Sequence, residues 1–179
     1  MKLGVIADIH GNEPALRAVL DDAARHRVDR WWVLGDLVLF GPRPGGATVL
    51  GVHASPGADD GPAIDPHLPD EQLRGLLAGC GTDVVVGGHT HYQADRLISG
   101  IRALNPGSTA MPRPTGQACW LLLQDRGRAG LTAEHRTVPY DAGAVARDLH
   151  RRRHPNAAFI ADVLTGQREQ YRTPSAAAP

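Results

Sequence analysis

The chain has 179 residues, 42% of them hydrophobic and 21% charged, and its 19 basic side chains balance its 19 acidic ones. A chain of this length forms one domain that buries about 70% of its unfolded surface. The zero net charge and the aromatic content of 4% argue against a nucleic-acid partner, whose binding surface shows a basic excess. No apolar run approaches the roughly 18 residues of a membrane span, and the first residues lack the order of a signal peptide. We therefore expect a cytoplasmic protein with no membrane partner.

The N-terminal half alternates strand and helix patterns. Segment 3–7 is a short apolar run, as expected of a strand buried on both faces. Asn12 suits the cap of a following helix and Pro14 suits its first turn. Further buried strands are expected over 31–34, 47–52 and 83–86, a helix over about 70–78, and loops over 41–46 and 55–69, the second of them long and on the surface.

The C-terminal half predicts two hairpins and two helices. Segments 96–98 and 101–104 flank Ser99 and Gly100, a pair typical of a tight turn. A second hairpin is expected from 118–123 and 131–138, and helices from about 142–152 and 157–164. The domain is expected to cover residues 1–170, and residues 171–179 are expected to form a flexible tail.

Side chains that bind metals follow the predicted strands at the points where the strands end. They are Asp8, His10, Asp36, His53, His89 and His91. Because open α/β sheets bind ligands beyond the carboxyl ends of their strands, these groups can converge although they are distant in sequence. Mixed carboxylate and imidazole donors suit Mn, Fe, Zn, Co or Ni better than Mg or Ca. Six donors exceed what one ion with open positions takes, which indicates two ions bridged by a carboxylate.

Each of these segments also has an ordinary structural interpretation. An Asp-x-His sequence after a strand is typical of a polar turn, and an isolated histidine such as His53 is often a hydrogen-bonded structural residue. The pair His89 and His91 is more specific, because two neighbouring imidazoles at a strand end have little packing role. The remaining histidines show no such placement, and we interpret most of them as surface residues.

The order of five short motifs is more specific than any one of them. They are Asp8-Ile9-His10-Gly11-Asn12, Gly35-Asp36-Leu37-Val38, Val52-His53-Ala54-Ser55-Pro56, Gly88-His89-Thr90-His91 and Asn105-Pro106-Gly107-Ser108. In this order they resemble the calcineurin-like metallophosphoesterases, and most closely their small prokaryotic phosphodiesterase branch. The resemblance implies a four-layer α/β/β/α sandwich with a dinuclear metal site at one edge of the sheets.

The resemblance also implies a role for each of these residues. Asp8, His10 and His91 would hold one ion, His53 and His89 would hold the other, and Asp36 would bridge the two. Asp36 and His53 are also the residues to which we assign catalysis. The expected cofactors are two divalent transition-metal ions, Mn first, with Ni, Fe, Zn or Co as alternatives, and the expected substrate is a small phosphoester. Asn12 and Asn105 are candidates for fixing the loops that carry these ligands, although Asn12 serves equally well as a helix cap.

The sequence departs from the family in one segment. Members carry a Gly-Asn-His-Asp or Gly-Asn-His-Glu motif between the segments that here contain Asp36 and His53, and no asparagine of this chain precedes a histidine. We infer an internal deletion that shortens the sandwich and removes one asparagine ligand of the second ion. It also removes the histidine that would contact the phosphate or protonate the leaving group. His67 and Arg43, both in flanking loops, are candidate substitutes.

Two functions are consistent with these residues. The first is a metal-dependent phosphoesterase that hydrolyses phosphodiesters with impaired or altered catalysis. The alternative is a weak or inactive interaction module that keeps the sandwich, because fold does not imply function. An oligomer or a protein partner would then be expected at the sheet edge left by the deletion.

Overall fold

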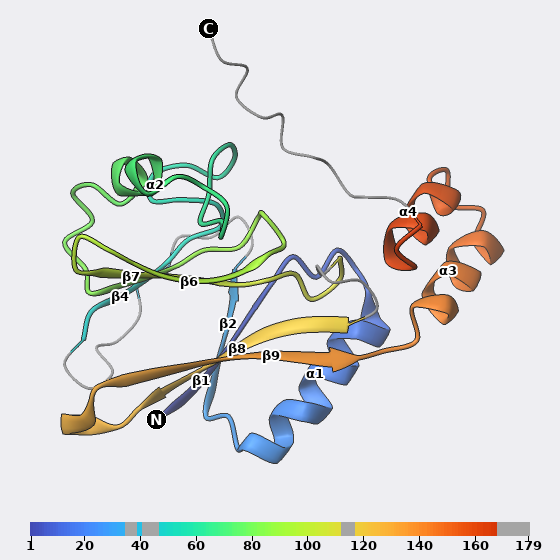
Figure 1. Cartoon of the computed structure of the whole chain (residues 1–179). Coiled ribbons are helices and arrows are strands. Elements are labelled where there is room, and N and C mark those ends of the chain that lie inside the picture. The colour runs from blue at the N-terminus through green and yellow to red at the C-terminus, as the bar shows by residue number, and fades with distance from the viewer. Residues whose placement is uncertain (35–38, 41–46, 112–116, 168–179) are drawn as a thin grey trace, which may run out of the picture.

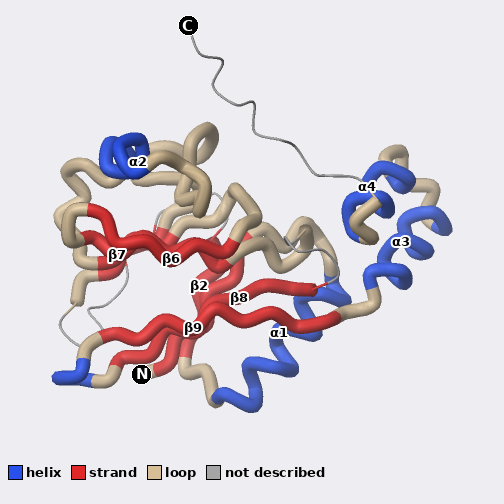
Figure 2. The backbone as a smooth tube through the Cα atoms, in the orientation of Figure 1, coloured by secondary structure: helices blue, strands red, loops and turns tan. Residues whose placement is uncertain are grey.

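The computed structural model describes residues 1–34, 39–40, 47–111 and 117–167, which form two stacked sheets (Figure 1). Helix α1 (Glu13–His26) covers the outer face of the first sheet, and helix α2 (Asp70–Leu76) covers the outer face of the second. Figure 2 shows the strands between α1 and α2. This α/β/β/α layering confirms the predicted fold class.

The first sheet has four strands in the order β2-β1-β8-β9. β1 pairs in parallel with β2 and antiparallel with β8, which in turn pairs antiparallel with β9. The last two strands are the predicted C-terminal hairpin, with a short 3-10 turn over Gly127–Ala129. The strand bounds are β1 (Lys2–Ala7), β2 (Arg30–Leu34), β8 (Gln117–Asp125) and β9 (Leu131–Pro139).

The second sheet has five strands in the order β3-β4-β5-β7-β6. Its three central strands run parallel, and β3 and β6 are antiparallel edges. The turn between β6 and β7 has positive φ at both Ser99 and Gly100, which matches the right-handed twist of a hairpin. The bounds are β3 (Leu39–Phe40), β4 (Val49–Gly51), β5 (Val84–Val86), β6 (Gln93–Ile98) and β7 (Ile101–Pro106).

Alternating side chains explain the layers. In β1, Leu3 and Val5 face the core between the sheets, whereas Ile6 faces α1. In β5, Val86 faces the same central core, whereas Val85 faces α2. Each such aliphatic side chain contributes about 1.5–3 kcal/mol when fully buried. Strands that are apolar at every position therefore form sheets that are buried on both faces.

The helices form where the sequence predicts them. The Asn12 side chain accepts a hydrogen bond from the backbone N–H of Ala15 at 3.2 Å and so caps α1. Helices α3 (Ala142–Arg151) and α4 (Ala157–Leu164) follow β9 and lie beyond its end, at the right of Figure 1. Within the described ranges, no helix combines the length and the apolar character needed to cross a bilayer.

Two local expectations need correction, and one strand was missed. β2 was expected to be buried, but it is an edge among the described strands and Val33 is 45% exposed. The loop over 55–69 does not lie wholly on the surface, because two of its own residues, Ala63 and Ile64, are buried. The sequence did not predict β3. The loop over 41–46 and the tail over 171–179 lie outside the described residues.

Candidate metal centre

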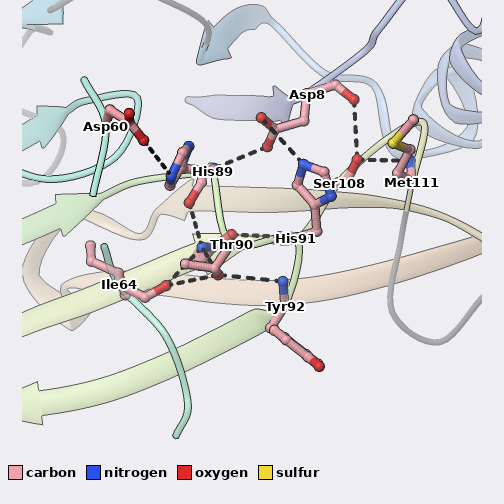
Figure 3. Close-up of polar contacts among 12 residues, drawn as sticks. Asp8, Asp60, Ile64, His89, Thr90, His91, Tyr92, Ser108 and Met111 are labelled. Carbon is pink, nitrogen blue, oxygen red and sulfur yellow. Dashed lines mark hydrogen bonds and ion pairs between the residues drawn. The ribbon is translucent and has the colours of Figure 1, made fainter. Parts of the chain in front are cut away.

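Asp8 directly follows β1 and anchors the site. Asp8 is buried, although it carries a carboxylate, and the strand before it is apolar. The backbone carbonyl of Asp8 accepts a hydrogen bond from the Ser108 hydroxyl at 3.1 Å (Figure 3). It also accepts one from the Ala110 N–H at 3.2 Å. The segment after β7 therefore holds the backbone at the end of β1 through these two hydrogen bonds.

Asp8, His10 and His91 form one group of metal-type donors. One ligand atom from each of the three lies within 4.8 Å of the others. The Asp8 carboxylate and the Nε2 atom of His91 are 3.8 Å apart, and the rings of His10 and His91 meet edge to face with centroids 5.5 Å apart. The three residues come from the ends of β1 and β5, which belong to different sheets. The structure thus brings together the set that the resemblance implied for the first ion.

His53 and His89 form a second group next to the first. Their ring centroids are 5.2 Å apart, and the Gly88 N–H donates to the His53 carbonyl at 2.6 Å. The backbone N–H of His89 also donates to the Asp8 carboxylate at 3.1 Å. Asp8 therefore contacts His91 through one oxygen and the His89 backbone through the other, which places the two groups side by side.

The backbone of the site is strained. Four of the seven described non-glycine residues with positive φ are Asp8, His10, His89 and His91, with φ of 53°, 45°, 70° and 65°. Such conformations cost of order 1–3 kcal/mol each and persist only where the surroundings enforce them. Their concentration at the predicted ligands shows that the surrounding structure, rather than the preference of each residue, sets the backbone at these positions.

Asn105 enforces the conformation of the histidine loop. The two N–H groups of this buried side chain are shared among three acceptors, the carbonyls of Ile64 and Gly88, both at 2.8 Å, and the Thr90 hydroxyl at 3.1 Å. Its own oxygen accepts a hydrogen bond from the Gly107 N–H at 2.9 Å. Asn105 therefore ties the loop over 87–91 to the end of β7 and to the loop that precedes α2.

Close backbone packing supports the same loop. A Cβ atom at Gly88 would lie 2.8 Å from the Ala7 Cβ and 2.9 Å from a carboxylate oxygen of Asp8. Only glycine lets the chain pass this close to Asp8. Asn12 contributes from the helix side, where its amide donates to the Ala110 carbonyl and the Tyr140 hydroxyl, both at 3.3 Å.

The remaining predicted residues are distributed differently. Asp36 and Arg43 lie outside the described residues. His67 pairs with Asp65 at 3.1 Å and meets the Tyr92 ring edge to face. His135, one of the histidines that we interpreted mostly as surface residues, is half-buried and contacts the Asn105 carbonyl through Nε2 at 2.8 Å. Burial lowers the pKa of His135, more than its backbone contacts raise it.

Asp60 is a residue that sequence reasoning missed. Its carboxylate lies 3.4 Å from the Nε2 atom of His89 (Figure 3). Asp60 belongs to a loop rich in Gly, Pro and Asp, where no periodic pattern marks one carboxylate above another. Its position shortly after the Val52-His53 segment is the signal that could have found it.

The donor set fits divalent transition-metal ions. Carboxylate and imidazole together suit this class of ion. In addition, the Nδ1 atom of His53 is buried and has no hydrogen-bond partner among the described residues. Because buried polar atoms normally have a partner, this nitrogen is consistent with a role in coordination.

Known proteins match this chain in sequence and in fold. Residues 1–50 match the family model of the calcineurin-like phosphoesterases. A probable metallophosphoesterase of Methanothermobacter thermautotrophicus is 37% identical over 62 residues, which cover 35% of this chain and 36% of the relative. The match thus spans about a third of that curated relative.

Two crystal structures have a similar fold. A hypothetical protein from Pyrococcus horikoshii OT3 superposes with a TM-score of 0.76 at 15% identity, covering 91% of this chain and 97% of that one. A metallophosphoesterase from Sphaerobacter thermophilus superposes with a TM-score of 0.71 at 17% identity, covering 92% and 98%. Together the matches confirm the resemblance inferred from the motifs and the fold that it implied.

Proposed function

We propose that this chain, which matches the calcineurin-like phosphoesterases over its first 50 residues and has the metallophosphoesterase fold, is a metal-dependent phosphoester hydrolase. The observation that carries the proposal is the convergence of Asp8, His10 and His91, whose ligand atoms lie within 4.8 Å of one another. Small phosphodiesters are the proposed substrates.

In this proposal the two groups of residues hold two divalent ions. Asp8, His10 and His91 would hold one ion, His53 and His89 would hold the other, and Asp36, which lies outside the described residues, would be the ligand that both share. Bound divalent ions supply positive charge to phosphoryl oxygens and increase the acidity of a water molecule. Manganese is the first candidate, with Ni, Fe, Zn and Co as alternatives, because this donor set accepts all of them.

The chain's own residues position this chemistry. The buried carboxylate of Asp8 supplies negative charge between the two histidine groups, and Ser108 and Ala110 hold its backbone. His10 is exposed, so this side chain of the first group can be reached by a small phosphoester. Asn105 keeps His89 and His91 in their strained conformations.

The sequence lacks the Asn-His pair, and we assign no residue to protonation of the leaving group. General acids typically contribute about 10²–10⁴ in rate. We therefore propose impaired catalysis that favours aryl esters, because an aryl oxide leaves without a proton. Alkyl phosphodiesters should be hydrolysed more slowly by a factor of this order.

Hydrolysis of an aryl phosphodiester by the metal-stripped protein, with and without Mn²⁺, tests the proposal. We expect turnover that requires Mn²⁺, stops with chelator, and falls more than about 100-fold in Asp8→Asn and in Asp36→Asn, because even changes beyond the ligands cost 10–100-fold. Asp21→Asn, which alters an exposed carboxylate on α1, is the matched control and should retain full activity. Turnover that survives in Asp8→Asn would contradict the proposal.

A second candidate function is an interaction module without catalysis. The exposed edge strand β2, with Val33 45% exposed, favours it, because an edge strand can pair with another chain. A folded protein that binds Mn²⁺, hydrolyses no phosphoester and forms a complex sensitive to Val33→Lys would support this function instead.

A further inference from the structure

The loop between β4 and α2 brings a carboxylate to the second group of histidines. We propose that Asp60 is a ligand of the second metal ion, together with His53 and His89. The inference rests on the proposed function, since it assigns a residue within that metal centre. The carboxylate of Asp60 would replace the asparagine oxygen that the resemblance implies and that this sequence lacks.

The distance between Asp60 and His89 is the first argument. The carboxylate oxygen Oδ1 of Asp60 and the Nε2 atom of His89 are 3.4 Å apart, and Figure 3 shows the two groups pointing toward each other. A hydrogen bond between such atoms is typically 2.7–3.2 Å long. Two donors that each lie about 2.1 Å from a tetrahedral ion are separated by about 3.4 Å. The separation therefore fits two ligands of one ion better than a direct hydrogen bond.

The environment of His53 is the second argument. Its Nδ1 atom is buried and lacks a hydrogen-bond partner in the described part of the chain, and its ring meets that of His89 at 5.2 Å. His89 itself faces Asp60 with the atom Nε2. His89 therefore neighbours both His53 and Asp60, and a cation drawn between these side chains would satisfy the buried nitrogen and balance the carboxylate charge.

The loop is anchored on both sides of Asp60. Ser55 and Ala58 exchange two backbone hydrogen bonds of 3.0 and 3.1 Å, which close a turn before Asp60. After it, Ile64 is fully buried and its carbonyl accepts from Asn105 and Thr90. The Gly61 N–H donates to Asp60 Oδ1 at 2.7 Å and so orients the carboxylate. The position of this exposed side chain is therefore set by the loop and by the same asparagine that fixes His89.

Manganese titration of the metal-stripped protein tests this assignment. We expect wild type to bind two equivalents of Mn²⁺, and Asp60→Ala to bind the first normally and the second at least tenfold more weakly. Electron paramagnetic resonance should show spin coupling between the two ions in wild type that is lost in Asp60→Ala at one or two equivalents. Asp60→Asn, which keeps an oxygen at this position, should recover part of the second-site affinity.

Asp59→Ala is the matched control. It removes the same charge one residue earlier, and Asp59 makes no hydrogen bond or ion pair with the described residues. Equal weakening in both alanine variants would overturn the ligand role and indicate a general electrostatic effect. Wild-type affinity for both ions in Asp60→Ala would also overturn it, as would a wild-type protein that binds only one ion.

The outcomes separate the ligand assignment from the proposed function. Two bound ions with loss of the second in Asp60→Ala, but no hydrolysis, would support the ligand and contradict the phosphoesterase activity. Manganese-dependent hydrolysis with unchanged binding in Asp60→Ala would support the activity and overturn the ligand.

Discussion

Asp22 is a buried charge that serves the fold rather than the metal centre. It lies on the inner side of α1 and accepts hydrogen bonds from Arg136 at 2.9 Å, from Arg25 at 3.0 Å and from the indole of Trp120 at 3.2 Å. Burial raises the pKa of Asp22, but the hydrogen bonds from Arg136, Arg25 and Trp120, together with the charge of Arg136, outweigh this and lower it below its ordinary value. The carboxylate joins α1 to β8 and β9.

Removal of this carboxylate should destabilise the protein. Asp22→Ala leaves Arg136 and Trp120 without their shared acceptor, so we expect the free energy of unfolding to fall by about 3 kcal/mol in urea titrations at pH 7. Because the folded pKa is lowered, the stabilisation is present above the unfolded pKa of about 3.9 and is lost as the pH falls through the folded value. Wild type should therefore lose its advantage over Asp22→Asn below about pH 4. Asp21→Ala should change stability by less than about 0.5 kcal/mol, and an equal effect of both variants would contradict the assignment.

Single residues also show what the sequence could reveal about the site. The motif order selected Asp8, His10 and His91, because each lies within a few residues of the end of a strand whose apolar character is clear. Asp60 could not be found in this way, because its loop has no periodicity and its relation to His89 depends on the path of the chain in space. Asp36, which the motif order also selected, stays a prediction.

At the level of elements, the histidine loop depends on the end of β7. Asn105→Ala removes the buried hydrogen bonds to the carbonyls of Ile64 and Gly88 and leaves Thr90 as their remaining donor, so the strained conformations of His89 and His91 lose part of their support. We expect manganese affinity to fall about 10–100-fold, as for other residues that orient metal ligands. Asn156→Ala, at the start of α4 where the side chain makes no capping bond, is the control. Unchanged manganese titration curves for Asn105→Ala would show that the loop over 87–91 keeps its conformation without Asn105.

The elements themselves were largely predictable, and the exceptions have physical causes. The buried strands and the capped helix α1 were evident because apolar periodicity and turn residues agree in those segments. β3 has only two residues, too few for any period to show. The exposure of Val33 was missed because an apolar edge strand reads like a central one in sequence, and only the pairing order distinguishes them.

For the whole molecule, bound metal should stabilise the fold. A ligand that binds only the native state adds about 2.7 kcal/mol when its concentration is 100 times its dissociation constant. For a chain of this size that raises the melting temperature by about 5–10 °C. Calorimetry of the chelated protein with and without Mn²⁺ should show this shift, and Asp8→Asn should abolish most of it. A shift of the same size in Asp8→Asn would mean that the ions bind elsewhere.

The site draws its side chains from both sheets, and this has a kinetic consequence. Asp8 ends a strand of the first sheet, whereas His53 and His89 follow strands of the second. These contacts join distant parts of the chain, so their closure entropy delays them until both sheets have formed and docked. Ions that bind there would stabilise the native state but not the folding transition state, in which the site is not yet formed. They should therefore slow unfolding and leave the folding rate nearly unchanged.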